Sequence, residues 1–177
     1  MYTLNSVCKR RLILISERIL SIINEQINRE FYSGYLYLSI SAYFREMGLF
    51  GFANRTKLQA AEEMQHGMKL FEFVIDRDGC VNLKQIDSPQ VEFGSPLEIY
   101  EKIYEHEKSI TNAIMDVARF AEEECDRTTL SFIDWYINEQ IEEERNALDI
   151  VKRLKIFGDD KSSLFLMDNE LRDYKQA

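Results

Sequence analysis

Apolar residues recur three and four positions apart along four long stretches of the chain, which is the spacing that places side chains on one face of an α-helix. These stretches cover about residues 16–47, 50–76, 95–124 and 126–157, and a shorter apolar segment follows over 162–174. Residues 79–95 lack this spacing and are numerous enough to cross the length of a bundle. The pattern predicts an all-α protein: a four-helix bundle with a long crossover between its second and third helices and a short fifth, C-terminal helix.

The inward face of every predicted long helix carries a carboxylate where an apolar side chain is expected. These residues are Glu30, Glu63, Glu107 and Glu143, and His66 shares the face of Glu63 because it stands three residues later. A glutamate is almost never fully buried without a partner, and an unpaired carboxylate in an apolar interior costs several kcal/mol. Four inward carboxylates therefore indicate a shared cation site. A metal-free bundle whose acids line a polar seam stays open as the alternative.

The spacing of these residues occurs twice along the chain. Glu63 stands 33 residues after Glu30 (63 − 30), and Gln140 stands 33 residues after Glu107 (140 − 107). A further candidate ligand follows three residues later in each copy, a histidine in the first and a glutamate in the second. One inward glutamate on two helices and Glu-x-x-His on the other two is the arrangement of ferritin-like dimetal carboxylate bundles. The chain matches this arrangement on three helices and departs from it on the fourth, which has no histidine.

Three segments carry a closer resemblance, to the prokaryotic non-haem ferritins, in their residues, order and spacing. The resemblance extends from about Ser16 to Tyr174 and implies a ferritin-like di-iron domain over residues 16–177. Residues 1–15 have no counterpart in it and are expected to be an N-terminal extension, either docked or disordered, or the result of a start site assigned too early. The segments are Asn24-Glu25-Gln26 with Glu30-Phe31-Tyr32, Glu62-Glu63-Met64-Gln65-His66, and Trp135-Tyr136-Ile137-Asn138-Glu139-Gln140-Ile141-Glu142-Glu143-Glu144.

The resemblance implies which residues hold two iron ions. Glu30, Glu63 and His66 would hold the first iron, Glu63 would bridge to the second, and Glu107 and Glu143 would hold the second iron. Carboxylates with few imidazoles are hard ligands that suit iron or manganese rather than thiophilic metals. Between these two metals, iron is the one that the resemblance implies, both as a resident of the site and as substrate.

Two residues are candidate catalytic residues beside these ligands. Gln140, counted with the metal site, would give a hydrogen bond to a bound water or oxygen species. Tyr37, one heptad after Glu30, would face the same cavity and could hydrogen-bond a ligand or donate an electron, with an ordinary core tyrosine as the alternative. Trp135 could be a second electron donor, but packing is the favoured interpretation.

Three more acids, Glu62, Glu139 and Glu142, could form a third, outer iron site together with Glu143, as in similar bacterial ferritins. Solvated acids on a surface are the alternative interpretation. Met64 occupies the position of the haem-binding methionine of related bacterioferritins, but the fourth helix lacks the second histidine expected of those proteins. No haem is therefore expected.

The reaction that the resemblance implies is the oxidation of Fe(II) to Fe(III) by dioxygen or peroxide, followed by storage of a ferric oxide mineral. The protein would be a ferroxidase and iron-storage protein, assembled as a homo-oligomer into a hollow shell of 24 subunits. The alternative is a di-iron oxidase or peroxidase, rubrerythrin-like or bacterioferritin-like, that retains its metals. A second Glu-x-x-His or a Cys-x-x-Cys module would favour that alternative, and the chain has neither.

Charge and cysteine usage narrow the possible partners and compartment. The net charge is −9, from 31 acids against 22 bases, which disfavours nucleic acid and anionic membranes as partners. No apolar run approaches the roughly 18 residues of a membrane span. Cys8, Cys80 and Cys125 form no Cys-x-x-Cys pair, so we expect free thiols and a cytoplasmic protein. His106 lies off the inward face of its helix and is expected at the surface or at an interface.

Overall fold

The computed structural model describes residues 14–158 and 160–173, and these residues form four long α-helices and one short one. The observed bounds lie within about two residues of the predicted ones, and the predicted all-α fold is confirmed. Residues 1–13 of the expected N-terminal extension lie outside the described residues. The helices are α1 (Glu17–Glu46), α2 (Phe50–Asp76), α3 (Pro96–Glu123), α4 (Arg127–Phe157) and α5 (Lys161–Arg172).

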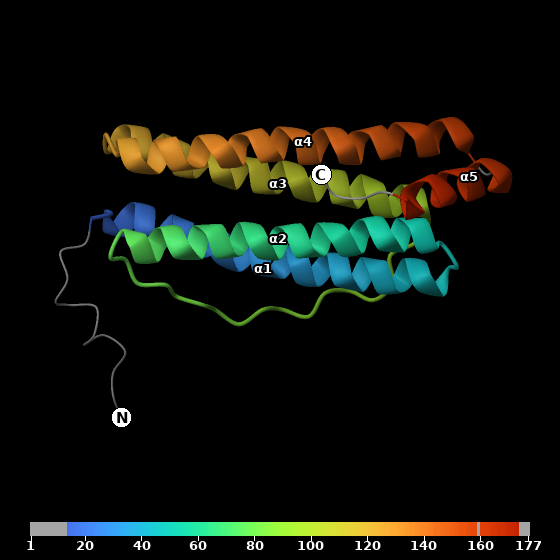
Figure 1. Ribbon diagram of the computed structural model, residues 1–177, viewed down its shortest axis with the longest axis horizontal. Helices are drawn as coiled ribbons and strands as arrows, with labels where there is room; N and C mark the ends of the chain where they lie inside the picture. The colour runs from blue at the N-terminus through green and yellow to red at the C-terminus, as the bar shows by residue number, and fades with distance from the viewer. Residues whose placement is uncertain (1–13, 159, 174–177) are drawn as a thin grey trace, which may run out of the picture.

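The four long helices pack as two antiparallel pairs. α1 and α2 form one pair, α3 and α4 form the other, and the two pairs stack as the layers of one bundle (Figure 1). The crossover, residues 77–95, runs beside the α1–α2 layer and returns the chain to the end of the bundle at which α2 began. α2 and α3 therefore run in the same direction, as they do in ferritin-like bundles with one long crossover.

Side chains of α1 attach the crossover to the bundle. Asn24 donates to the carbonyl of Cys80 (3.0 Å) and accepts from the amide of Asn82 (2.6 Å). Asn28 accepts from the amide of Lys84 (2.6 Å) one turn further along. The crossover has no helical hydrogen bonds of its own here, so these side chains satisfy backbone groups that would otherwise need water.

The sequence sets where each helix begins. Ser16 and Asp126 accept hydrogen bonds from backbone amides in the first turns of α1 and α4. Ser95 and Glu98 form the capping box that their spacing predicts at the start of α3. These caps satisfy donors that a helix leaves unpaired at its N-terminus, and they fix which residues of each helix face inward.

Two apolar clusters fill the bundle, one towards each end. One contains the rings of Phe44, Phe52 and Tyr100, whose centroids lie 5.3–6.1 Å apart. The other is built around residues such as Ile23 and Ile114. The predicted inward faces of α1 and α2 are buried along their length, glutamates included. The buried carboxylates lie between the two clusters, so apolar packing flanks them on both sides.

α5 is anchored to the first turn of α2 by the carboxylate of Asp168, which is 1% exposed. Asp168 accepts hydrogen bonds from the amides of Gly51 (2.7 Å) and Phe52 (3.1 Å). α2 has no side-chain cap of its own at Leu49, so α5 supplies the cap and a negative charge at the positive end of the helix. Residue 51 must be glycine for this approach, because a Cβ atom there would lie 1.7 Å from the carbonyl oxygen of Asp168.

The structure tests the predictions made for the cysteines and for membrane-spanning segments. The prediction of free thiols holds for the exposed Cys125 and is wrong for Cys80, which is disulfide-bonded. Cys8 lies outside the described residues. A disulfide is rare in the reducing cytoplasm, so Cys80 does not support the expected cytoplasmic location. No helix within residues 14–158 and 160–173 is both long enough and apolar enough to cross a membrane.

We expect Asp168→Ala to lower the free energy of unfolding by about 1–3 kcal/mol, because it leaves two buried backbone amides without acceptors. Urea unfolding of the metal-free protein, followed by circular dichroism, measures the change. Asp149→Ala removes an exposed carboxylate from α4 and is the matched control, with an expected change within about 0.5 kcal/mol. Equal unfolding midpoints for the two variants would show that the α5 cap contributes nothing to stability.

Candidate metal centre

Five buried ligand residues from all four long helices meet in the middle of the bundle. They form two groups, Glu30, Glu63 and His66 in one, and Glu63, Glu107 and Glu143 in the other. Within each group, one ligand atom from each residue lies within 4.8 Å of the others. The structure thus brings together the five residues that the resemblance assigns as ligands of the first two irons. Glu63 belongs to both groups, which is the position that a bridging carboxylate would take.

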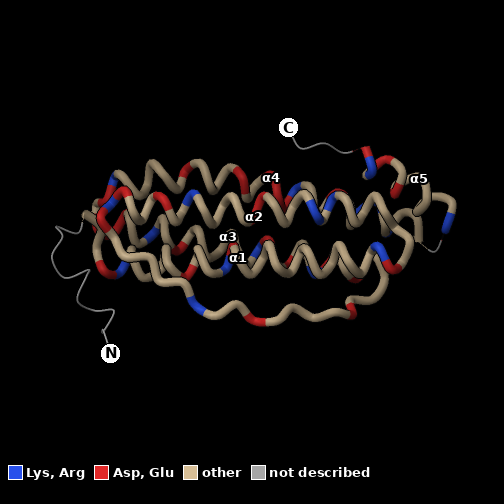
Figure 2. The backbone as a smooth tube through the Cα atoms, turned by 60° about the horizontal axis from the view of Figure 1, so that its bottom comes forward, with Lys and Arg blue, Asp and Glu red and all other residues tan. Residues whose placement is uncertain are grey.

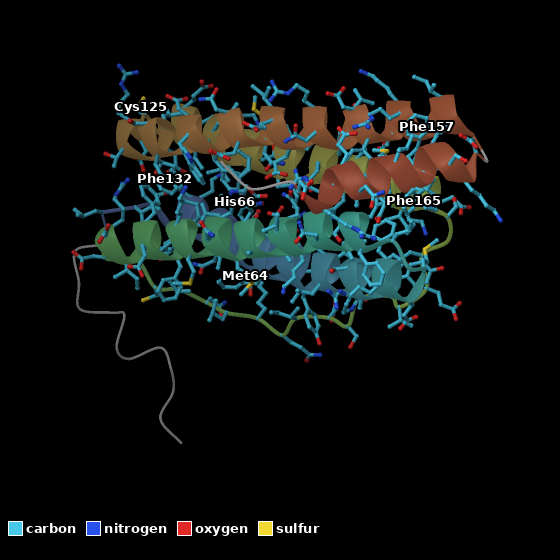
Figure 3. All side chains as sticks on the ribbon, turned by 45° about the vertical axis from the view of Figure 1, so that its right-hand side comes forward. Met64, His66, Cys125, Phe132, Phe157 and Phe165 are labelled. Carbon is cyan, nitrogen blue, oxygen red and sulfur yellow. The ribbon has the colours of Figure 1, made fainter. Side chains whose placement is uncertain are left out.

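The helical spacing of α2 places the histidine beside its glutamate. His66 Nδ1 lies 3.4 Å from Glu63 Oε2 and 3.9 Å from Glu30 Oε2. The imidazole packs against the rings of Trp135 and Tyr136, with centroids 5.6 and 5.3 Å away. Figure 3 shows His66 between α2 and α4. Aromatic side chains of α4 therefore orient a ligand carried by α2.

Two glutamines, each one helical turn before a glutamate ligand, hold these carboxylates in place. Gln26 donates to Glu30. Gln59 donates to Glu63 Oε1 (2.8 Å) and also to Glu143, so one amide joins a ligand of α2 to a ligand of α4. Sequence reasoning gave neither glutamine a role. Their position four residues before a glutamate on the same helical face is the signal that could have identified them.

Glu107 is held by the two residues that the sequence nominates as catalytic. The hydroxyl of Tyr37 donates to one carboxylate oxygen of Glu107. The amide of Gln140 donates to the other oxygen (3.2 Å) and to the backbone carbonyl of Glu107 (3.4 Å). Both residues therefore contact a ligand of the second group. Their roles towards a bound oxygen species stay predictions.

Two ligand atoms in the first group, Glu30 Oε2 and His66 Nδ1, are buried and have no hydrogen-bond partner within the described part of the chain. Buried polar atoms are nearly always paired in native proteins, so an orphaned pair of acceptors marks a place for a ligand. Carboxylate oxygen and imidazole nitrogen at this spacing suit a divalent first-row cation such as Fe(II). The donor set therefore fits the iron that the sequence predicts.

Burial and mutual repulsion favour the protonated form of most of these carboxylates when no cation is bound. Burial, together with the negative charge of Glu63, raises the pKa of Glu107 to about 8. The same two causes raise the pKa values of Glu30 and Glu143 well above the ordinary range. Burial also acts on Glu63, but the neighbouring imidazole of His66 outweighs it and lowers the pKa of Glu63. A cation entering the site must therefore displace protons.

The proposed outer site is not assembled in the same way. Glu62 and Glu139 are half-buried and Glu142 is exposed. Glu62 faces the guanidinium of Arg55 at 3.7 Å. Among the described residues, these three acids join no group as tight as the two around Glu63, and only Glu143 of the predicted set lies in one. The third iron site remains a prediction.

The remaining sequence candidates lie around this centre. Trp135 stacks on Tyr136 with centroids 5.2 Å apart, and the ammonium of Lys69 lies 3.6 Å from the centre of its ring, which is the packing arrangement that the sequence favoured. Met64 lies on the opposite side of α2 from His66 (Figure 3) and is 45% exposed.

His106, which was expected at the surface or at an interface, is not fully exposed, and the interface stays a prediction. Its side chain is half-buried, and Nε2 lies 2.8 Å from the hydroxyl oxygen of Ser33 on α1. Its ring also meets Tyr37 edge to face, with centroids 6.1 Å apart. The histidine misses the inward face of α3 in the helical projection, but the neighbouring helix α1 covers that side of α3.

Comparison with known proteins gives a consistent relationship over most of the chain. A family model described as a ferritin-like domain matches residues 20–157, which contain all five clustered ligands. A relative from Haemophilus influenzae, named "Probable bacterial non-heme ferritin-like protein", is 39% identical over 89% of this chain and 96% of its own length. The bacterial non-heme ferritin of Bacteroides fragilis is 37% identical over 89% of this chain and 98% of its own length.

A solved structure of an open pore ferritin from the archaeon Archaeoglobus fulgidus superimposes with a TM-score of 0.90. It is 45% identical and covers 91% of this chain and 99% of the archaeal chain. Fold, order of helices and sequence therefore agree on one relationship. The chain belongs to the ferritin family, among the non-haem ferritins.

Proposed function

We propose that this protein stores iron: it oxidises Fe(II) to Fe(III) at the two ligand groups and holds the product as a ferric oxide mineral inside a hollow shell. The observation that carries this proposal is the meeting of five buried ligand residues at which Glu63 is shared by both groups. The relatives named bacterial non-heme ferritin support it. Dioxygen or peroxide would accept the electrons.

The difference between the two groups suits iron that passes through as substrate. The first group offers an imidazole and two carboxylates, whereas the second offers only carboxylates. A second histidine would make a symmetric and more firmly held pair of metals. With Glu143 in that place, the second iron has no nitrogen ligand and would leave more easily towards the mineral. Glu62, Glu139 and Glu142 would receive it as the outer site.

The protein's contribution to the chemistry is proximity and orientation. Glu63 would hold two Fe(II) ions side by side, so an oxidant meets two electron donors in one place. Gln140 would keep Glu107 in position and give a hydrogen bond to a bound water or oxygen species. Tyr37, hydrogen-bonded to the same carboxylate, would supply an electron or a hydrogen bond.

Exposed apolar side chains support assembly into a homo-oligomer, for which we propose the shell of 24 subunits. They include Tyr35, Leu38, Met64 and Met68 on α1 and α2, and Phe165 on α5. Large apolar side chains gathered on the outside of a soluble domain are typical of protein interfaces. Acidic and basic residues are interspersed along the helices (Figure 2), and the acidic excess of the chain would favour the approach of cations.

Iron retention tests storage directly. We expect the metal-free protein, mixed with excess Fe(II) in air and passed over a size-exclusion column, to retain iron far beyond about two or three ions per chain in a large particle. Retention that stops at about two ions per chain in a small oligomer would instead identify a di-iron oxidase or peroxidase that keeps its metals.

Removal of the shared ligand tests the oxidation step. We expect Glu63→Gln to slow Fe(II) oxidation by at least about tenfold, since one ligand of both groups is lost. Stability of the metal-free protein should be unchanged or higher, because a buried charge is removed. Glu72→Gln, an exposed glutamate on the same helix, is the control. Unchanged oxidation in Glu63→Gln would favour a metal-free structural bundle.

The buried carboxylates also predict a pH dependence. The pKa of Glu107 is about 8 in the folded protein against an ordinary 4.5, so the folded state binds the extra proton. Its contribution to stability is complete below the unfolded pKa and is lost as the pH rises through 8. We therefore expect the urea midpoint of the metal-free protein to fall between pH 6 and about pH 8.5, and less steeply in Glu107→Gln.

Chelator-treated protein is the material for this measurement, and Glu105→Gln, an exposed neighbour on α3, is the control. With a divalent cation in excess the trend should reverse, because ligand deprotonation then favours the bound state. A metal-free midpoint that rises with pH, in the wild type and in Glu107→Gln alike, would contradict the assignment of a protonated buried cluster.

A further inference from the structure

A small cavity opens beside the second ligand group, away from His66. Glu107 and Glu143 line it together with Arg55, Tyr100 and Asn146. Its volume of about 20 Å³ admits a molecule of about one or two oxygen atoms. The cavity therefore joins two ligands of the proposed second iron to side chains that the iron itself would not contact.

Arg55 is an unexpected residue in this place. It is 8% exposed and lies on the same face of α2 as Gln59 and Glu63, four and eight residues before them. Its guanidinium faces Glu62 at 3.7 Å, and its positive charge also acts on Glu143 and Tyr100. An arginine is always charged and only donates hydrogen bonds, so it adds nothing to the binding of a cation. It favours an oxygen species with negative or developing negative charge.

Tyr100 gives the second and independent sign of a ligand. Its hydroxyl is buried, the residue is 3% exposed, and the oxygen has no hydrogen-bond partner within the described part of the chain. Leaving a buried hydroxyl unpaired destabilises the folded protein. A phenylalanine would fill the same space without that cost. The hydroxyl therefore indicates a polar molecule in the cavity that it lines.

The lining side chains differ in what they offer to a bound molecule. Arg55 donates hydrogen bonds, and the carboxylates of Glu107 and Glu143 accept them when ionised. The molecule that suits both kinds of group is small, carries protons and has oxygen lone pairs. Hydrogen peroxide meets these requirements and is also an oxidant for two Fe(II) ions.

We propose that this cavity binds hydrogen peroxide beside the second iron, with Arg55 and Tyr100 donating hydrogen bonds to one of its oxygens. In the reaction, two Fe(II) ions each lose one electron, the O–O bond breaks, two protons are taken up, and two water molecules form. Arg55 stabilises the negative charge that develops on the departing oxygen. This inference rests on the proposed function and specifies the oxidant that the site receives.

The decisive variant is Tyr100→Phe, which removes one oxygen atom and no contact within the protein. Anaerobic protein carrying two Fe(II) per chain is mixed with increasing hydrogen peroxide in a stopped-flow instrument. We expect the KM for peroxide to rise about fivefold because one hydrogen bond to peroxide is lost, and we expect kcat to change little. Arg55→Met should raise the KM further and lower kcat, and Arg55→Lys should restore part of both.

Matched controls separate a specific effect from a general one. Tyr104→Phe changes a half-buried tyrosine one turn along α3, and Arg119→Met changes an exposed arginine of the same helix. Neither should alter the KM. The amount of Fe(II) bound before oxidant is added should be equal in all variants. A wild-type KM in both Tyr100→Phe and Arg55→Met, or an equal loss of iron binding and oxidation, would overturn the inference.

A crystal structure of the metal-free wild type gives a readout without turnover. We expect an ordered oxygen atom within about 3 Å of both the Tyr100 hydroxyl and the Arg55 guanidinium, and its loss in Tyr100→Phe. An empty cavity in the wild type would also overturn the inference. If the wild type oxidised iron with dioxygen but not with hydrogen peroxide, the assignment of the cavity to peroxide would be wrong, and the proposed storage of iron would stand. If it oxidised no iron with either oxidant, the proposed function itself would fail.

Discussion

The burial of several negative charges at one point is the constraint on which this structure depends. Glu63 belongs to both groups of buried ligand residues, and an apolar cluster fills the bundle on either side of them. Without a cation, the cluster limits its own charge by holding protons, which is why the pKa of Glu107 rises to about 8. With cations, the same closeness becomes coordination. One geometry therefore explains both the free-energy cost of burying these carboxylates without metal and the ability of the site to hold a metal ion.

The fold keeps this cluster in shape with devices spread over the whole chain. Gln59 and Gln140 fix ligand carboxylates by donated hydrogen bonds, and each contacts a ligand on another helix. The crossover lets α2 and α3 run in the same direction, and side chains of α1 hold that crossover in place. Asp168 ties α5 to the first turn of α2, the helix that carries the shared ligand. A rigid frame of this kind positions ligands before the metal arrives.

The two ends of the site have different surroundings. The first group lies against the rings of Trp135 and Tyr136 and contains the imidazole. The second group has no imidazole, and Glu107 and Glu143 of that group line a cavity together with Arg55 and Tyr100. In the function that we propose, this asymmetry would divide labour: the first group would hold one ion firmly, and the second group would exchange the other ion and its oxidant. This difference between the two groups corresponds to the absence of a second histidine from α4, where Glu143 stands instead.

The sequence by itself determined the helices, the crossover and the five candidate ligands, because helical periodicity makes a carboxylate on an apolar face conspicuous. It also placed Tyr37 and Gln140 at the site. Only the tertiary structure decided what comes from contacts between helices: the partners of each glutamine, the half-buried place of His106, the cap that Asp168 gives to α2, and the meeting of Arg55 with Tyr100. A periodic pattern shows which way a residue faces along its own helix. It does not show which residue of another helix lies opposite, because that depends on how the helices pack against one another.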